Sequence, residues 1–402
     1  MMEALLWYRK NAPEQYGRLM AGLEYTNRAE NIGQDLASGL YRKEGVPDFS
    51  FSSSRLEKYG KCPFSHFVGY GLRPLERRSY EIAPLDVGDL CHRCLMKLSE
   101  RLTKEGVEIR EESSPWMTVS KEECDRLVEE ILLKEGRTYR EGLISSGREQ
   151  EYRGERVKQI CRESAWIMVD HVRKGAILAM GYEVPFGRSY PMKPIQVPYG
   201  DGTIFIEGKI DRIDQLEDGY VKVIDYKSGN ATYSEEEAKA GWKLQLFVYL
   251  LAASGEEKKP AGAFYFPISE PFIDASGKEK NVVRQSLEKD LRKEFKMDGI
   301  LLNKDKVIRG VAGEFSRFSD IAPVERVQGS PKPTAKVLDK EEFHALLSAV
   351  SLRIEEMSRE IVTGEIGIHP RKTKTIAACT HCDYKGICKF DRAIEGCDYV
   401  RI

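Results

Sequence analysis

Residues 220–229 read Tyr-Val-Lys-Val-Ile-Asp-Tyr-Lys-Ser-Gly. The first five of these residues are rich in β-branched side chains, which is typical of a β-strand. The run then delivers an acid and a base, Asp225 and Lys227, and the Ser-Gly pair after them marks a sharp exit from a sheet. The sequence therefore predicts a strand that ends in a carboxylate and an ammonium group.

A second acidic segment lies just upstream. Residues 203–207 (Thr-Ile-Phe-Ile-Glu) are predicted as the neighbouring strand, and residues 208–214 (Gly-Lys-Ile-Asp-Arg-Ile-Asp) follow it with Asp211. The Glu-Asp-Gly stretch at 217–219 predicts the hairpin turn between the two strands. Such a hairpin brings Asp211 close to Asp225. Mg²⁺ and Mn²⁺ prefer oxygen ligands, and an adjacent lysine can stabilise a hydroxide nucleophile or a crowded phosphate.

A helix is predicted from about Ser234, with an apolar face that includes Trp242 and Leu250. Gln245 and Tyr249 lie one turn apart on this helix and can point back toward the acids. Taken alone, the pair is typical of polar positions on a core helix. Beside the predicted hairpin, it is a candidate part of the same site.

Together these segments resemble the PD-(D/E)xK nuclease superfamily in its RecB-like branch. Members of that branch carry Gly-x-x-Asp-x-hydrophobic-Asp, then Asp-Tyr-Lys-Ser-Gly, then a helical Gln-x-x-x-Tyr, and these patterns lie here at 208–214, 225–229 and 245–249. The branch also has a helical Gly-x-x-x-His, which Gly88–His92 matches. The resemblance implies an α/β fold with a restriction-endonuclease-like core, in which helices flank a central mixed sheet. It also implies a large helical insertion at about residues 100–181.

The resemblance further implies the roles of the site residues. One or two Mg²⁺ or Mn²⁺ ions would be held by Asp211, Asp225, His92 and the main-chain carbonyl of Tyr226. A lone histidine on an apolar helix is more often a core residue, but His92 occupies the motif position. In this branch the lysine orients or stabilises the nucleophile, and the Gln–Tyr pair positions the lysine or the DNA backbone. The implied catalytic residues are Asp211, Asp225, Lys227, Gln245 and Tyr249.

The nine cysteines of the chain fall into two classes. Cys379, Cys382 and Cys388 form C-x2-C-x5-C, which is metal-ligand spacing, and Cys62 stands far earlier in the chain. The sequence shows no signal peptide, and a cytoplasmic compartment with reduced thiols argues against structural disulfides. Four thiolates in a one-plus-three arrangement suit zinc or a [4Fe–4S] cluster, and the spacing does not decide between them.

RecB-like nucleases with an iron–sulfur staple have one cysteine before the nuclease core and three after it, and Cys62, Cys379, Cys382 and Cys388 match this layout. The segment around Cys62 resembles the AddB family of bacterial helicase–nuclease proteins, and this likeness covers roughly residues 50–392. It implies a [4Fe–4S] cluster in preference to zinc, DNA as the substrate, and an AddA-type helicase–nuclease subunit as the partner. Two further cysteines flank His92 and are interpreted as core-facing thiols, namely Cys91 and Cys94.

The function that the resemblance implies is metal-dependent hydrolysis of DNA. We expect a deoxyribonuclease, with exonuclease action mainly on single strands, in double-strand-break processing by an AddAB-type helicase–nuclease. Two alternatives stay open. The first is a catalytically silent or partner-dependent DNA-binding domain, and the second is a zinc-stapled scaffold for a helicase. A CRISPR adaptation nuclease shares the motifs and the staple but is typically much shorter.

Composition sets further limits. The chain has 63 Lys and Arg against 64 Asp and Glu, with a net charge of −1, so no overall basic field indicates a nucleic-acid partner. A DNA-binding surface must therefore be local, and the best candidate is the basic run at 371–374. No apolar run approaches the roughly 20 residues that cross a membrane. No phosphate-binding P-loop is present, so we expect no nucleotide to bind to this chain.

The chain is predicted to divide into three parts. Residues 1–50 read as helical and lie outside the nuclease motifs, and we interpret them as the trailing edge of a helicase-like region or as part of a stand-alone relative. Residues 51–392 form the predicted nuclease domain, and residues 393–402 form a tail. A helix at about 340–363 leads into the cysteine segment. Residues 269–335 are polar and rich in Gly and Pro, and we assign them no structure.

Overall fold

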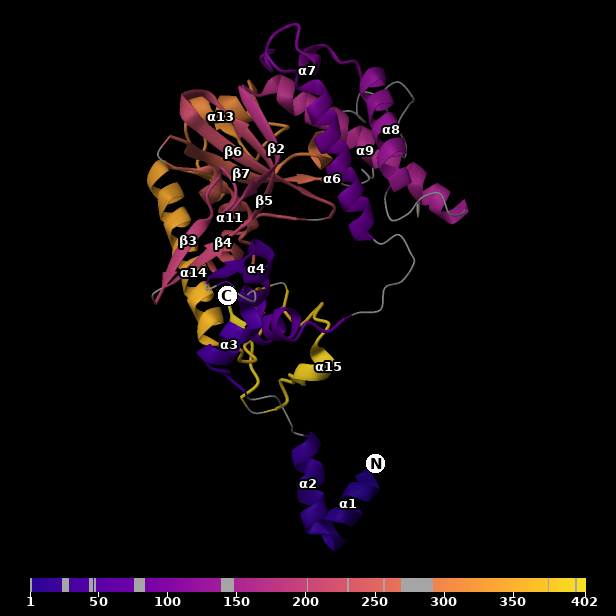
Figure 1. The fold of residues 1–402 in the computed structure, drawn as a ribbon, viewed down its shortest axis with the longest axis vertical. Helices are drawn as coiled ribbons and strands as arrows, with labels where there is room; N and C mark the ends of the chain where they lie inside the picture. The colour runs from indigo at the N-terminus through magenta and orange to yellow at the C-terminus, as the bar shows by residue number, and fades with distance from the viewer. Residues whose placement is uncertain are drawn as a thin grey trace.

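The structure is a computed structural model that describes residues 2–23, 29–42, 46, 48–75, 84–138, 148–200, 202–229, 231–255, 257–268, 292–374, 376–394 and 396–402. Figure 1 shows a sheet-centred body, a helical wing beside it and a smaller lobe that joins early and late parts of the chain. Residues 139–147 of the predicted helical insertion lie outside the described residues, as does part of the segment 269–335.

A mixed sheet of six strands forms the centre of the body, in the order β11-β8-β7-β6-β5-β2. The pair β6–β7 is parallel, whereas β6 pairs antiparallel with β5, and β5 pairs antiparallel with β2. This arrangement confirms the predicted fold class. The strands are β2 (Ala179–Phe186), β5 (Gly208–Gln215), β6 (Tyr220–Lys227), β7 (Lys259–Pro267), β8 (Asp298–Leu302) and β11 (Val337–Leu338).

The hairpin forms at the predicted turn, but its first strand is not the predicted one. The strand β5 is itself the segment 208–215, so Asp211 lies in mid-strand and not beyond a strand end. The run 203–207 largely forms β4, which belongs to a separate sheet with β1 and β3. The members of this second sheet are β1 (Phe49–Phe51), β3 (Ile195–Tyr199) and β4 (Gly202–Ile206).

A buried ion-pair network explains why the sequence of β5 has the polarity of a surface segment. Arg212 donates two hydrogen bonds to the Asp214 carboxylate, from Nε to Oδ1 at 2.6 Å and from Nη2 to Oδ2 at 2.8 Å. The ammonium of Lys222, on β6, lies 3.2 Å from the same carboxylate. All three residues are at most 1 % exposed. These charged residues of the hairpin are therefore core residues, which a polarity pattern cannot reveal.

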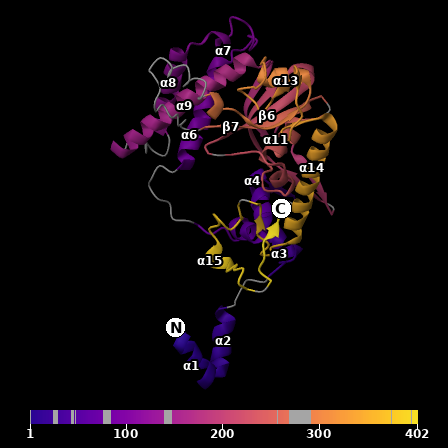
Figure 2. The same ribbon diagram turned by 180° about the vertical axis from the view of Figure 1, so that it is seen from behind.

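A helical wing lies to one side of the sheet, and the views in Figures 1 and 2 agree on this. Its helix α6 contacts β2 and packs against α8 and α9. Cys91 and Cys94 on α6 are fully buried, as predicted, and Sγ of Cys91 lies 3.0 Å from Sγ of Cys161. The wing comprises α6 (Pro84–Leu102), α7 (Pro115–Thr118), α8 (Lys121–Thr138) and α9 (Arg148–Lys174).

The helix predicted from Ser234 is in fact two helices. Ser234 caps the short helix α10 (Glu235–Lys239), and α11 (Gln245–Ala253) begins after an irregular connection. Gly241 in this connection has φ +85°, a backbone conformation that favours glycine, and it ends the first helix. The helix α11 packs against β6 and β7. The later helix α14 (Lys340–Thr363) has the predicted bounds.

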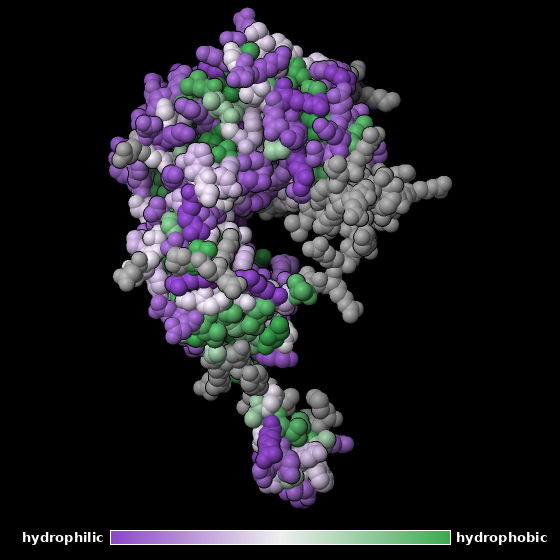
Figure 3. Space-filling model, in the orientation of Figure 1, coloured by the Kyte–Doolittle hydropathy of each residue, from purple (hydrophilic) through white to green (hydrophobic). Residues whose placement is uncertain are grey.

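The smaller lobe brings early and late segments of the chain together (Figure 1). It contains the elements that carry the predicted cysteine ligands. In the view of Figure 3, apolar residues gather on the face of this lobe near α3 and α15, whereas most of the upper body is hydrophilic. Its elements are α3 (Gln34–Tyr41), α4 (Ser53–Lys61), α5 (Pro63–His66), the π-helix η1 (Phe67–Leu72), β12 (Arg371–Lys372), α15 (Lys385–Cys388) and β13 (Val400–Arg401).

The remaining elements lie at the N-terminus, in the hairpin turn and in the segment 269–335. That last segment supplies β8 to the central sheet, so part of it belongs to the core. In the described part of the chain, no helix combines the length and apolar composition that a membrane crossing requires. The elements are α1 (Met2–Asn11), α2 (Pro13–Leu23), η3 (Glu217–Gly219), α13 (Asp305–Ala312), β9 (Arg326–Val327) and β10 (Ser330–Pro331).

The buried network predicts a large loss of stability in Asp214→Asn. The substitution keeps the side-chain volume but leaves Arg212 and Lys222 buried without a counter-charge, which costs about 3–5 kcal/mol. Urea unfolding of the variant and of wild type measures the difference. The matched control is Asp218→Asn in the hairpin turn, where the carboxylate makes an exposed ion pair with Lys306. Equal stability of the two variants would contradict the assigned role of the network.

Candidate active site

Three acidic residues lie in a row across neighbouring strands. The ladder between β2 and β5 pairs Tyr182 with Arg212 and Val184 with Ile210, which sets Glu183 opposite Asp211. The ladder between β5 and β6 pairs Arg212 with Ile224, and Asp211 and Asp225 are the next residues along their strands. Side chains of directly opposed residues lie on the same face of a sheet. The register therefore gathers three carboxylates on one face.

Asp211 is held from two directions. The main-chain N–H of Tyr226 donates to Asp211 Oδ2 at 3.0 Å, and Nδ1 of His92 lies 3.4 Å from the same oxygen. The other ring nitrogen of His92, Nε2, is 2.6 Å from the carbonyl oxygen of Tyr226. Burial raises the pKa of Asp211 above its ordinary value, and the nearby imidazole opposes that shift. The helix α6 thus brings His92 onto the hairpin, although the two are far apart in the sequence.

Asp225 is the most deeply buried acid of the site, with 1 % exposure. Its Oδ2 lies 2.6 Å from Nζ of Lys227, two residues along the same strand face. Apart from this ion pair, neither carboxylate oxygen accepts a hydrogen bond within the described residues. Burial, with a further contribution from the charge of Asp211, raises the pKa of Asp225 to about 8 against the lowering effect of Lys227. The negative charge of such a buried carboxylate is unfavourable until a cation binds beside it and takes the place of the proton.

Lys227 has a second partner on α11. Its Nζ donates to Oε1 of Gln245 at 2.7 Å, and Nε2 of Gln245 donates to the hydroxyl of Tyr249, also at 2.7 Å. The amide of Gln245 is thereby fixed at both ends. The predicted Gln–Tyr pair therefore does face the hairpin, through the lysine and not through a direct hydrogen bond to an acid.

Glu183 is the residue that sequence reasoning missed. One potential ligand atom each from His92, Glu183 and Asp211 lie within 4.8 Å of one another, and Asp225 is not part of this tightest set. Glu183 has φ +48°, unusual for a residue with a side chain, and it makes an ion pair with Lys209. The only signal in the sequence is a lone acid in the otherwise apolar run 179–186.

This donor set suits a hard divalent cation. Imidazole nitrogen, carboxylate oxygens and a main-chain carbonyl converge at one end of the hairpin, and such ligands bind Mg²⁺ or Mn²⁺. The short contact between Nε2 of His92 and the Tyr226 carbonyl joins two of the predicted ligands. A buried carboxylate with unused oxygens supplies negative charge beside them. The residues therefore fit a divalent metal ion.

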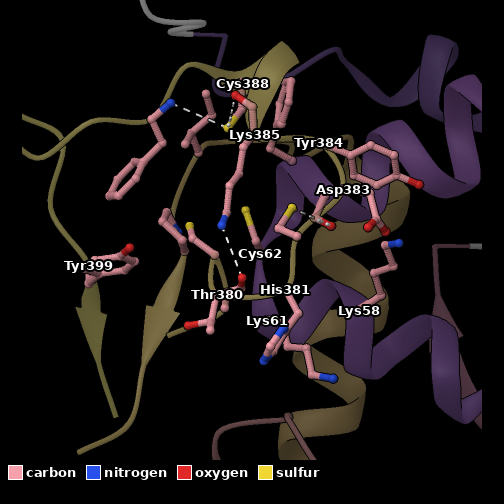
Figure 4. A pocket seen from close by; sticks show the side chains of 18 of the residues that line it. Lys58, Lys61, Cys62, Thr380, His381, Asp383, Tyr384, Lys385, Cys388 and Tyr399 are labelled. Atoms are coloured by element: carbon pink, nitrogen blue, oxygen red, sulfur yellow. Dashed lines mark hydrogen bonds between the residues drawn. The ribbon is translucent and has the colours of Figure 1, made fainter. Parts of the chain in front are cut away.

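A second site lies in the smaller lobe. A cavity of about 610 Å³ is lined by all four predicted ligands, Cys62, Cys379, Cys382 and Cys388. Figure 4 shows Cys62, at the end of α4, and Cys388, in α15, facing the same space. The cysteines that are most distant in sequence are thus neighbours in the fold. All four are free thiols in the structure.

The surroundings of these thiols suit a bound metal or cluster. The N–H of Phe390 donates to Sγ of Cys388 at 3.5 Å, and main-chain N–H groups of Phe64 and Ser65 face Cys62. Burial raises the pKa of the Cys62 thiol to about 12, so this thiol is protonated at neutral pH unless a metal takes the place of the proton. Cys62 and Cys388 belong to an apolar cluster that also includes Phe64, with Phe390 packed against it.

The predicted basic run at 371–374 divides into two kinds of residue. Arg371 is half-buried, and its Nη1 donates to the main-chain carbonyl of Ala240 at 2.5 Å. Lys372 and Lys374 are exposed. Arg371 therefore serves the packing of the lobe onto the body, and the two lysines are the part of this run that a phosphate can reach.

Comparison with known proteins places this geometry in context. The chain is 36 % identical to a protein of Alkaliphilus metalliredigens that is named as the B subunit of an ATP-dependent helicase/deoxyribonuclease, over 98 % of its own length and 34 % of that protein. It is 33 % identical to the protein of the same name from Alkaliphilus oremlandii, over 98 % and 34 % of the two lengths. For that of Caldanaerobacter subterraneus subsp. tengcongensis, the identity is 32 % over 100 % and 34 %. The chain thus spans about a third of the length of these relatives.

A family profile agrees with the site. Residues 50–389 match the profile of the PD-(D/E)XK nuclease superfamily, and this range includes both the hairpin and the cysteine-lined cavity. The match extends over most of the chain, and the mixed sheet with its acids on one face agrees with the expected architecture. The chain belongs to the PD-(D/E)XK nuclease superfamily.

Proposed function

We propose that this chain is a metal-dependent deoxyribonuclease that hydrolyses phosphodiester bonds, mainly in single-stranded DNA. The observation that carries the proposal is the buried carboxylate of Asp225, which lies between Lys227 and the second acid, Asp211, at one end of the hairpin. A surface hairpin with ordinary charges would not bury an acid whose oxygens lack hydrogen bonds. The superfamily match supports hydrolysis as the reaction type.

Asp211, Asp225, His92 and the Tyr226 carbonyl are the proposed metal ligands, and we add Glu183 on the strength of its position. A divalent cation bound there lowers the pKa of a water molecule and neutralises charge on the scissile phosphate. The residues themselves supply orientation. Asp211 is fixed by the Tyr226 N–H, so the ligand set is largely in place before a cation binds.

Lys227 is the proposed stabiliser of the nucleophile. Its ammonium is held between Asp225 and Gln245, with both contacts within 2.7 Å, so its position is defined by two groups on different elements. A positive charge in this place favours a hydroxide or a phosphate oxygen over neutral water. Gln245 and Tyr249 act on the lysine, and their proposed role is to keep it in position.

The four cysteines of the lobe are the proposed ligands of a [4Fe–4S] cluster. A single zinc ion draws four sulfurs to within about 2.3 Å of one atom. The cavity of about 610 Å³ that the four cysteines line has room for a cluster, and an N–H donor lies beside the sulfur of Cys388, as hydrogen bonds to the sulfurs do in cluster sites. The group would tie α4 to the segment after β12 and so close a very long loop of chain.

The names of the relatives support a wider role. They are called subunits of an ATP-dependent helicase/deoxyribonuclease. We therefore propose that the chain acts in double-strand-break processing, with exonuclease action on a strand that a helicase supplies. An AddA-type helicase–nuclease subunit is the proposed partner. The proposed contribution of this chain to the assembly is a nuclease centre.

Cleavage of end-labelled single-stranded DNA tests the nuclease centre. We expect wild type to cleave with Mg²⁺ or Mn²⁺, and Asp225→Ala and Lys227→Ala to reduce the rate by at least about a hundredfold, because each removes charge from the reacting centre. Circular dichroism checks that the variants keep their fold. The exposed Lys306→Ala is a control and should cleave as wild type does. Full activity in both site variants would sink the assignment.

Metal affinity should depend on pH through Asp225. Its raised pKa of about 8 means that a proton competes with the cation at neutral pH, so binding releases this proton. Calorimetric titration with Mn²⁺ should show affinity that rises by up to about tenfold per pH unit from about pH 6 to 8 and then levels off. Asp225→Asn has no such proton to lose, and its weaker affinity should change less with pH. Parallel pH profiles would show that Asp225 is not a ligand.

Iron and sulfide analysis of anaerobically purified protein decides the nature of the second site. We expect about four iron and four sulfide per chain, the content of a [4Fe–4S] cluster. Cys62→Ser should lose most of both, because it removes a buried ligand. The matched control is Cys397→Ser, which alters a half-buried cysteine outside the proposed ligand set. About one zinc and no sulfide per chain would overturn the cluster in favour of zinc.

A further inference from the structure

Glu57 connects two parts of the molecule that the proposed function treats separately. It lies on α4, and its Oε1 accepts hydrogen bonds from the main-chain N–H groups of Leu244 at 2.7 Å and Gln245 at 2.9 Å. Those two residues begin α11. The Glu57 carboxylate on α4 therefore binds the start of α11, the helix that carries Gln245 and Tyr249.

The start of α11 needs such an acceptor. The first N–H groups of a helix have no partners within the helix, and the positive end of the helix dipole favours a negative charge. Leu244 occupies the N-cap position, and its side chain offers no acceptor. Glu57 supplies from outside what a serine or an aspartate usually supplies locally. The direction and the starting point of α11 thus depend on α4.

The contact continues to the reacting centre. Gln245, whose N–H is bound by Glu57, accepts from Nζ of Lys227 at 2.7 Å through its side chain. Lys227 in turn lies 2.6 Å from Asp225. Each step is a direct contact, so a displacement of the Gln245 backbone moves the partner of the lysine. The side-chain oxygen that accepts from Lys227 thus belongs to a residue whose backbone N–H is held by Glu57.

The other end of α4 belongs to the cysteine-lined cavity. Cys62 is the residue at which α4 ends, and Glu57 and Cys62 line the same cavity. The backbone of α4 packs closely against the connection before α11, because a methyl group on Gly60 would lie 2.0 Å from the carbonyl oxygen of Gly241. Backbone meets backbone at this point. A change in the cavity that moves α4 is therefore passed to α11.

The connection between α10 and α11 is also held by β12, the strand that precedes the three late cysteines. Arg371, which precedes Cys379 in the chain, donates to the carbonyl oxygen of Ala240. The residues before α11 are thus held by α4 on one side and by β12 on the other. Cys62 directly follows α4, and Cys379 is the first cysteine after β12.

We propose that Glu57 is a positioning residue that ties the orientation of Lys227 to the cysteine-lined cavity. The inference rests on the proposed nuclease function, since Lys227 must act in catalysis for its position to matter. Through Glu57, the cysteine-lined cavity is linked to the hairpin by protein contacts alone, without DNA. The route runs from Cys62 at the end of α4, through Glu57, to the start of α11, where Gln245 holds the lysine.

Steady-state cleavage of single-stranded DNA by Glu57→Ala tests this route. We expect kcat to fall by roughly tenfold to a hundredfold, the scale of a small misplacement of a reacting group. KM should stay within about twofold of wild type, because Glu57 lies outside the proposed ligand set and acts on the position of the lysine. Glu57→Gln keeps an oxygen acceptor and should recover most of the rate. In a Gln245→Ala background, the loss of Glu57 should cost little more, since its effect passes through that residue.

A matched control separates positioning from simple loss of a helix cap. Ser120→Ala removes the hydroxyl that accepts a hydrogen bond from the N–H of Glu123 at the start of α8, in the helical wing away from this route, and it should leave kcat unchanged. Iron content and thermal unfolding confirm that each variant is folded and loaded.

Should Glu57→Ala not fold, Glu57→Asp withdraws the acceptor while keeping the charge, and it should also lower kcat. Wild-type kcat in a folded Glu57 variant, or additivity with Gln245→Ala, would overturn the inference. Absence of cleavage in wild type would instead refute the nuclease function.

Discussion

The burial of Asp225 is the constraint on which the site depends. Its carboxylate lies in the central strand β6 with only an ion pair to Lys227 among the described residues, and the charge of Asp211 on the next strand opposes its ionisation. Two carboxylates in such a place are unfavourable until a cation joins them. Three parts of the fold surround Asp225. The hairpin carries it, the wing supplies His92, and α11 supplies Gln245. The fold accepts an unfavourable arrangement of charge, and binding of a cation would relieve it.

Local signals were sufficient for much of the fold and of the site. The Glu-Asp-Gly turn, the strand β6 and the helix α14 all lie where composition and periodicity predict them. Contacts between residues a few positions apart were also predicted correctly. Asp225 and Lys227 share a strand face because they are two residues apart, and Gln245 meets Tyr249 because they are one helical turn apart. The likeness to RecB-like nucleases added what spacing cannot give, namely that His92 belongs beside the hairpin.

What escaped prediction depends on contacts between distant segments. Glu183 joins the site only through the register of β2 on β5, and Glu57 reaches α11 from a helix far earlier in the chain. The prediction for β5 was wrong because Arg212 and Asp214 neutralise one another in the core, where a polarity pattern indicates surface. The strand β8 was missed because its short apolar run stands in a polar region rich in Gly and Pro. In each case the missing information is which distant segment the residues contact, and a single sequence does not reveal it.

Anomalous diffraction from crystals soaked with Mn²⁺ is the most direct test of the central claim, which is that the hairpin forms a metal site. The account predicts an anomalous peak within about 2.0–2.6 Å of carboxylate oxygens of Asp211 and Asp225, with the Tyr226 carbonyl and His92 completing the shell. Such a peak would also show whether Glu183 coordinates the ion. Manganese bound only elsewhere, or no peak at the hairpin at saturating Mn²⁺, would contradict the account.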